Sequence, residues 1–82
     1  MIHIPGNVLE DMKIEGIDRA MVENTLLGAE ESFEKVFDEE KGLYFCHRRT
    51  GSVTLWVSYK KEGELLTVNS IYTHRMDIEE DI

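Results

Sequence analysis

Cysteine is almost absent from this sequence, with Cys46 the only one among 82 residues. A single thiol cannot form a disulfide within the chain, and it cannot supply the several thiolates that structural zinc sites commonly use. Because the three histidines are also far apart in sequence, we expect no metal site. Proteins that do not depend on disulfides are typical of reducing compartments, so we expect a cytoplasmic protein.

Long apolar runs and known cofactor motifs are missing as well. Uninterrupted apolar stretches are only a few residues long, and the opening MIHIPGN is too short for a signal peptide. The chain has no glycine-rich phosphate loop, no nucleophile elbow and no dinucleotide fingerprint. We therefore expect no membrane association and no bound cofactor, and a self-contained cofactor enzyme is excluded.

Positive charge is scarce in the first half of the chain and concentrated in the second. Residues 1–40 contain eleven acids and three bases, whereas residues 41–76 contain two acids and six bases. The formal net charge of −8 repels a polyanion at long range. General nucleic-acid binding is therefore disfavoured. The basic second half of the chain still allows a local basic surface as an alternative.

Two short helices are predicted before residue 32. Asn7, followed by Glu10, matches a capping box and predicts a first helix over residues 8–15. Asp18 predicts the cap of a second helix, and Gly28 marks its expected end.

Four stretches with alternating apolar residues follow the helices, as expected for half-buried strands. They are SFEKVFD, GLYFCHRR, SVTLWVSY and ELLTVNSIYTHR, separated by short segments that contain glycine. The sequence thus predicts a single α+β domain over residues 1–76, in which two short helices pack on a four-stranded antiparallel meander. Residues 77–82 are expected to form an acidic tail. The stretch IHIP is a further candidate for a short N-terminal edge strand.

The predicted core is drawn from both helices and from the inward positions of the strands. It contains Leu9, Met12, Ile17, Val22, Leu26, Val36, Phe45, Leu55, Val57, Leu66 and Val68. Trp56 alternates with these positions in its strand, which leaves two alternatives. Either a second layer covers it, which is the commoner case for a strand tryptophan, or it lies exposed and anchors a partner.

Basic and aromatic residues near the strand ends form the candidate binding surface. They are His47, Arg48, Arg49, Tyr72, His74 and Arg75. Arginines can hold a phosphate, and a histidine or tyrosine can move protons, as metal-free cleavage of RNA would require. The more common situation is that such residues are solvated strand ends paired with nearby acids.

Alternation along the strands divides these residues between two faces. His47 and Arg49 are expected on one face of their strand, with Arg48 on the other. In the last strand, His74 is expected on the same side as Tyr72. Arg75 follows the opposite side, where we expect it to be mainly structural and held by an acid of the helices or tail.

Two resemblances bear on function. The order IHIP, two helices and a run of hairpins resembles the RelE-like toxin superfamily, including its BrnT-type branch, in the stretches EGIDRAMVENTLLGAEE, GLYFCHRR and VTLWVSY. This resemblance implies a metal-free ribonuclease, with basic and aromatic positions matched at Arg48, Arg49, Tyr72, His74 and Arg75. The acidic balance of this chain departs from those usually basic toxins.

The second resemblance covers about a third of the chain. GSVTLWVSYKKEGELLTVNSIYTHRM is similar to the C-terminal part of small proteins labelled as a glutamate synthase (NADPH) small subunit. One cysteine cannot ligate the four-cysteine cluster that a true small subunit carries. The resemblance therefore implies an accessory piece beside a redox enzyme.

Three functions follow from these observations. The first is a non-catalytic accessory domain that binds a protein partner, and the alternative is a metal-free toxin ribonuclease. A third, weaker option is a regulator whose acidic helices mimic or mask nucleic acid.

Overall fold

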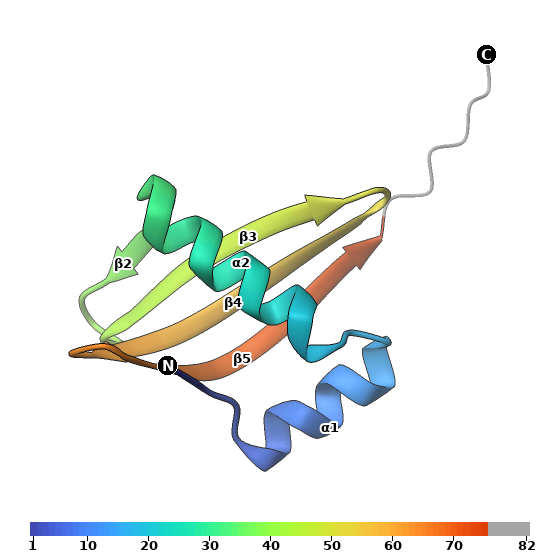
Figure 1. Cartoon of the computed structure of the whole chain (residues 1–82), viewed down its shortest axis with the longest axis horizontal. Coiled ribbons are helices and arrows are strands. Elements are labelled where there is room, and N and C mark those ends of the chain that lie inside the picture. Colours follow the sequence, from blue (N-terminus) through green and yellow to red (C-terminus); the bar gives the residue numbers. More distant parts are fainter. Residues whose placement is uncertain (76–82) are drawn as a thin grey trace.

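Both helices pack on the same face of one sheet, so the protein has two layers (Figure 1). The computed structural model describes residues 1–75. Along the chain the elements are β1 (Ile2–His3), α1 (Gly6–Glu15), α2 (Arg19–Ser32), β2 (Val36–Asp38), β3 (Leu43–Thr50), β4 (Val53–Glu62) and β5 (Leu65–Arg75). This arrangement confirms the predicted α+β class with two helices before the main sheet.

The sheet has five strands in the order β1-β5-β4-β3-β2. Strands β2 to β5 form the predicted antiparallel meander, with φ of 64° at Gly51 and 62° at Gly63 in the two tight turns. The prediction was incomplete at the other edge, where β1 pairs with β5 in parallel and Ile2 lies beside Leu66. The parallel β1–β5 pair makes the sheet mixed. The two helices connect β1, at one edge of the sheet, to β2 at the opposite edge.

The start of α1 differs from the prediction. Pro5, not Asn7, is the N-cap, and no side chain caps this helix. The Pro5 carbonyl accepts hydrogen bonds from the amides of Val8 and Leu9 at 3.1 and 3.0 Å. Pro5 has the extended backbone that is usual for an N-cap, with φ of −64° and ψ of 160°.

Helix α2 begins as predicted but ends later. The Asp18 carboxylate accepts a 2.9 Å hydrogen bond from the amide of Met21, which confirms the predicted cap. Gly28 does not end the helix, which continues to Ser32 and stops where Phe33 adopts a φ of 62°. The extra turn buries Ala29 against the sheet, and this packing offsets the weak helix propensity of glycine.

The core lies between the helices and the inner face of the sheet. Its buried apolar residues are Ile4, Val8, Met12, Ile17, Val22, Leu26, Ala29, Cys46, Leu55, Val57, Tyr59, Leu66 and Val68. Eight of the eleven predicted core residues are in this set. Leu9 and Val36 are instead exposed, and Phe45 is only partly buried, because they point away from the layer between helices and sheet.

A β-bulge changes which residues of β5 face the helices. Tyr59 pairs with Val68 and Ser58 pairs with Ser70, so Asn69 is an extra residue on β5. Simple alternation places Val68 and Ser70 on one face, and the bulge separates them. Val68 is fully buried, whereas Ser70 is exposed.

Beyond the bulge, alternation resumes in the opposite phase. Ile71 packs against the core, and the Thr73 hydroxyl donates a 2.6 Å hydrogen bond to the carboxylate of Glu15 on α1. Tyr72 and His74 therefore face away from the helices, which leaves them on the uncovered side of the sheet.

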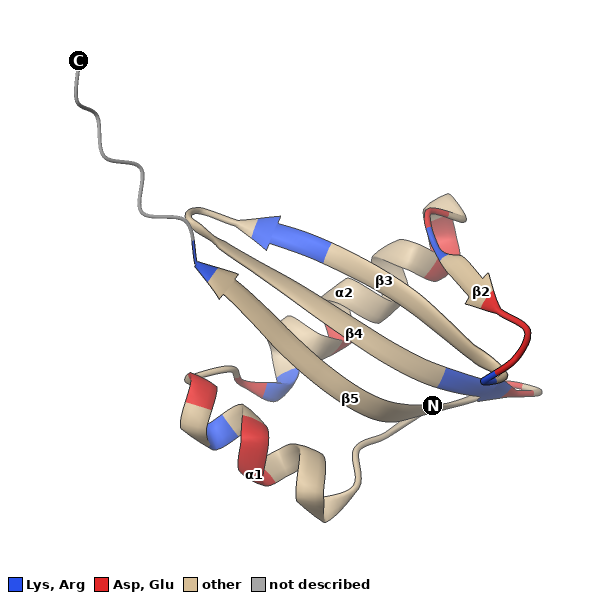
Figure 2. Cartoon of the chain, turned by 180° about the vertical axis from the view of Figure 1, so that it is seen from behind, with Lys and Arg blue, Asp and Glu red and all other residues tan. Residues whose placement is uncertain are grey.

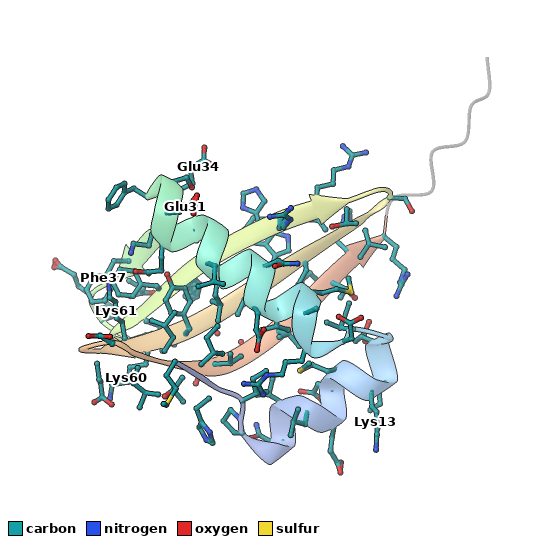
Figure 3. All side chains as sticks on the ribbon, viewed as in Figure 1. Lys13, Glu31, Glu34, Phe37, Lys60 and Lys61 are labelled. Carbon is teal, nitrogen blue, oxygen red and sulfur yellow. The ribbon has the colours of Figure 1, made fainter. Side chains whose placement is uncertain are left out.

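Hydrogen bonds between charged side chains connect the end of α2 to the sheet. The Glu30 carboxylate accepts 2.7 Å hydrogen bonds from the side-chain nitrogens of Lys35 and Lys61. Phe37 and Lys61 lie at this end of the molecule, near the last turn of α2 (Figure 3). The ring centroids of Phe37 and Tyr44 are 4.7 Å apart, so aromatic side chains pack against each other at this end of the core.

Candidate binding face of the sheet

The face of the sheet that points away from the helices has no covering layer within residues 1–75. Seen from behind, β3, β4 and β5 lie in front of α2, and α1 lies beside the edge of β5 (Figure 2). Large apolar side chains on this face are consequently open to solvent. This distinguishes it from the opposite face, where the same strands contribute the core.

Three ring-bearing side chains form a row across the middle of the open face. His47 on β3 is paired with Trp56 on β4, and Trp56 is paired with Tyr72 on β5. The imidazole and indole rings stack with centroids 4.4 Å apart and an interplanar angle of 25°. The row is therefore built by strand register, which places one ring on each strand at the same level.

Apolar residues extend this row toward β2. Phe45 is paired with Val36, and together with His47, Trp56 and Tyr72 they make up what we call the Trp56 face. Trp56 is 43% exposed, Tyr72 63% and Val36 69%. Between Phe33, Val36, Phe45 and Trp56 the surface is hollowed by about 500 Å³. A contiguous apolar surface of this kind, at the centre of a sheet, is typical of an interaction site.

The arginines and histidines predicted as site residues are divided between the two faces. Arg49 and His74 both lie beside Thr54 on the open face, because Thr54 is paired with each of them. Arg48 lies on the inner side, where it lines hollows with residues of α2. The structure thus brings Arg49 and His74 near the Trp56 face and separates them from Arg48.

Arg75 also lies on the inner side. One of its guanidinium nitrogens donates a 2.9 Å hydrogen bond to the backbone carbonyl of Glu15, at the end of α1. We expected an acid of the helices or tail to hold this arginine. Within residues 1–75 the partner is instead a helix C-terminal carbonyl, whose partial negative charge attracts a cation.

Cys46 is buried between α2 and the sheet. Burial raises the pKa of its thiol to about 11, and the charge of Glu30 acts in the same direction. The thiol is therefore protonated near neutral pH and is a poor nucleophile or metal ligand. Within the part of the chain that the structure describes, no group of three or more acidic, histidine or cysteine side chains is placed to bind a metal ion.

Val36 and Phe45 belong to the Trp56 face but were predicted as core. The sequence signal for their exposure was weak, because alternation shows which residues share a face and not which face is covered. Trp56 gave the clearest signal in the sequence, since it alternates with Leu55 and Val57, which were both assigned to the core. The structure selects the less common of the two alternatives considered for this tryptophan.

Comparisons with protein-family models, with curated proteins and with solved structures give no match to this chain. Across residues 1–75, neither helix is long and apolar enough to cross a membrane.

Proposed function

We propose that this protein is a small non-catalytic binding domain that docks on another protein through the Trp56 face. The observation that carries the proposal is the exposure of Trp56 at the centre of the sheet, stacked on His47 and beside Tyr72. Tryptophan and tyrosine dominate the energetics of many protein interfaces. The stack with His47 restricts the indole ring of Trp56, so less conformational entropy of this side chain is lost on binding.

The charge of the chain agrees better with a protein partner than with nucleic acid. The formal net charge is −8, which weakens any attraction to phosphate backbones. The resemblance of residues 51–76 to proteins labelled as a glutamate synthase small subunit makes an oxidoreductase of that type the first partner to test. In this proposal the chain is an accessory domain of the complex and contributes no cofactor.

The proposal is tested by comparing three immobilised proteins: wild type, Trp56→Ala and Leu27→Ala. Leu27 is a matched control because it is a large apolar residue on α2, 55% exposed, on the opposite layer. We expect a purified oxidoreductase of the glutamate synthase type to bind wild type and Leu27→Ala. Binding to Trp56→Ala should be weaker by about tenfold or more, as expected for an interface anchor. Equal binding to all three proteins would contradict the proposed surface.

A metal-free ribonuclease of RelE/BrnT type is the second candidate. The observation in its favour is that Arg49 and His74 flank Thr54 on the open face, beside Tyr72. An arginine could stabilise phosphate charge while the histidine moves a proton. Arg48 and Arg75 lie on the other side of the sheet and could not join them there.

Incubation of the purified chain with RNA separates the two candidates. Cleavage that is lost in His74→Ala and Arg49→Ala, and retained in Arg75→Ala, would support the ribonuclease. Absence of cleavage, with binding of a protein partner lost in Trp56→Ala, would support the accessory domain.

A further inference from the structure

The outer edge of β3 is only partly paired. Strand β2 pairs with residues 43–45, and within residues 1–75 no strand pairs with residues 46–50 on the side away from β4. Every second residue of such an edge presents its backbone N–H and C=O groups to solvent. About half of β3 is therefore available for pairing with a further strand.

Two hollows lie between this free edge and α2. One, of about 240 Å³, is lined by Thr25, Gly28, Ala29, Ser32, Glu34, His47 and Arg48. The other, of about 190 Å³, is lined by Met21, Asn24, Thr25, Arg48, Thr50, Val53 and Leu55. Arg48 lines both hollows. A strand added to this edge would point alternate side chains toward them.

Arg48 is an exposed cation without a carboxylate partner among the described residues. No salt bridge or hydrogen bond is formed by its guanidinium within residues 1–75, and Glu34, which lines one hollow, is not within 4.0 Å of it. Its side chain lies along α2, where Nη1 is 3.6 Å from the position that a Cβ of residue 28 would occupy. The guanidinium of Arg48 therefore lies beside Gly28 of α2, at the border of the first hollow.

We propose that the free edge of β3 is a strand-addition site for an extended acidic segment of another protein. The backbone of that segment would pair with residues 46–50, as in other cases of recognition at a sheet edge. A carboxylate on its inward side would bind Arg48, and small apolar or hydroxyl side chains two residues away would enter the hollows. This site shares His47 with the Trp56 face but lies at the edge of β3 and on its inner side, around Arg48, so the inference does not rest on the proposed function.

A second copy of the chain is a poor occupant of this edge. Two β3 edges in contact would bring together Arg48 and Arg49 of both copies, and the repulsion between like charges opposes such pairing. An acidic partner removes this repulsion and supplies the missing counter-charge. The edge charges therefore favour a partner that differs from this protein.

The experiment uses random heptapeptides displayed on phage and selected on the full-length protein. We expect enriched peptides to contain an acidic residue with β-branched residues two positions away. Titration of the synthetic peptides should show binding weakened by about 30-fold or more in Arg48→Glu, since the variant places like charges in contact. Arg49→Glu is the matched control, because it makes the same charge change on the opposite face and should alter binding less than about threefold.

Hydrogen exchange gives a second readout that does not depend on the folding of a variant. Bound peptide should slow amide exchange within residues 46–50 of the wild-type protein, with no comparable change in α1. Arg48→Gln, which removes the positive charge without adding a negative one, should show intermediate weakening in peptide titration. Failure to enrich any acidic peptide, equal binding to Arg48→Glu and wild type, or protection confined to other elements would overturn the inference.

Discussion

The hydroxyl of Tyr59 donates a 2.6 Å hydrogen bond to the carboxylate of Glu30. Tyr59 is fully buried on the central strand β4, and Glu30 lies on the last turns of α2. The contact joins the two layers at one end of the core. Burial and the hydrogen bond to Glu30 together raise the pKa of Tyr59 well above its usual range, so the tyrosine remains a donor.

Glu30 makes the stability of the fold depend on pH. Burial alone would raise the pKa of this carboxyl group, but hydrogen bonds from Lys35, Lys61 and Tyr59 lower it from 4.5 to about 2. Since the folded-state pKa is depressed, the stabilisation is complete above pH 4.5 and is lost as the pH falls toward 2. Glu30→Gln should therefore lower the free energy of unfolding by about 1–3 kcal/mol at pH 7.

Urea unfolding of wild type and Glu30→Gln at several pH values tests this linkage. The difference between the two proteins should shrink below pH 4.5 and become small near pH 2, where about half of the Glu30 carboxyl groups are protonated in the folded protein. A difference that is constant between pH 7 and pH 2 would show that charge is not the cause.

Adjacent residues on β4 should respond very differently to truncation. Leu55 is buried against the helices, so Leu55→Ala should cost about 2–5 kcal/mol of unfolding free energy. Trp56 is larger but lies on the open face, so Trp56→Ala should cost about 1 kcal/mol, mainly through loss of the stack with His47. Chemical denaturation measures both. A larger loss for Trp56→Ala than for Leu55→Ala would mean that the faces are assigned the wrong way round.

Gly28→Ala should stabilise the protein. The residue lies inside α2, and an added Cβ would meet only Nη1 of Arg48, at the ordinary contact distance of 3.6 Å. Alanine is favoured over glycine in a helix interior by about 0.5–1 kcal/mol. A thermal melt should show a higher midpoint than wild type. A lower midpoint would indicate that the space beside Arg48 is too small for a methyl group.

Deletion of Asn69 tests the bulge. Without the extra residue, β5 can pair regularly, with Val68 opposite Tyr59, Ser70 opposite Ser58 and Ile71 opposite Val57, so these side chains keep their present faces. We expect the deletion to cost less than about 2 kcal/mol of unfolding free energy, because the core contact of Ile71 and the hydrogen bond from Thr73 to Glu15 are both kept. Urea unfolding measures the change. A loss as large as that of a buried truncation, about 2–5 kcal/mol, would contradict this register.

Regular patterns in the sequence predicted most of the fold. Asp18 identified the start of α2 because its side chain caps the helix directly, and alternation identified β3, β4 and β5. The end of α2 was wrong because burial of Ala29 outweighs the local preference of Gly28. Such packing effects depend on residues distant in sequence, which no local pattern contains.

The candidate site was less predictable. Alternation alone predicted that Arg48 and Arg49 face opposite ways, but the bulge at Asn69 and the pairing of Trp56 with Tyr72 depend on strand register. Register is set by side-chain packing across strands and not by any one segment. The row of His47, Trp56 and Tyr72 therefore became visible only in the folded structure.

Site-specific photo-cross-linking tests the central claim, that the Trp56 face binds a protein partner. A benzophenone amino acid would be placed at Tyr72 on the open face and, as a control, at Ile14, which is exposed on α1. The partner would be the oxidoreductase of glutamate synthase type that is proposed above. We predict a discrete cross-linked complex from position 72 that disappears when Trp56→Ala is added, and none from position 14. Cross-linking from position 14 alone, or a complex from position 72 that Trp56→Ala leaves unchanged, would contradict the claim.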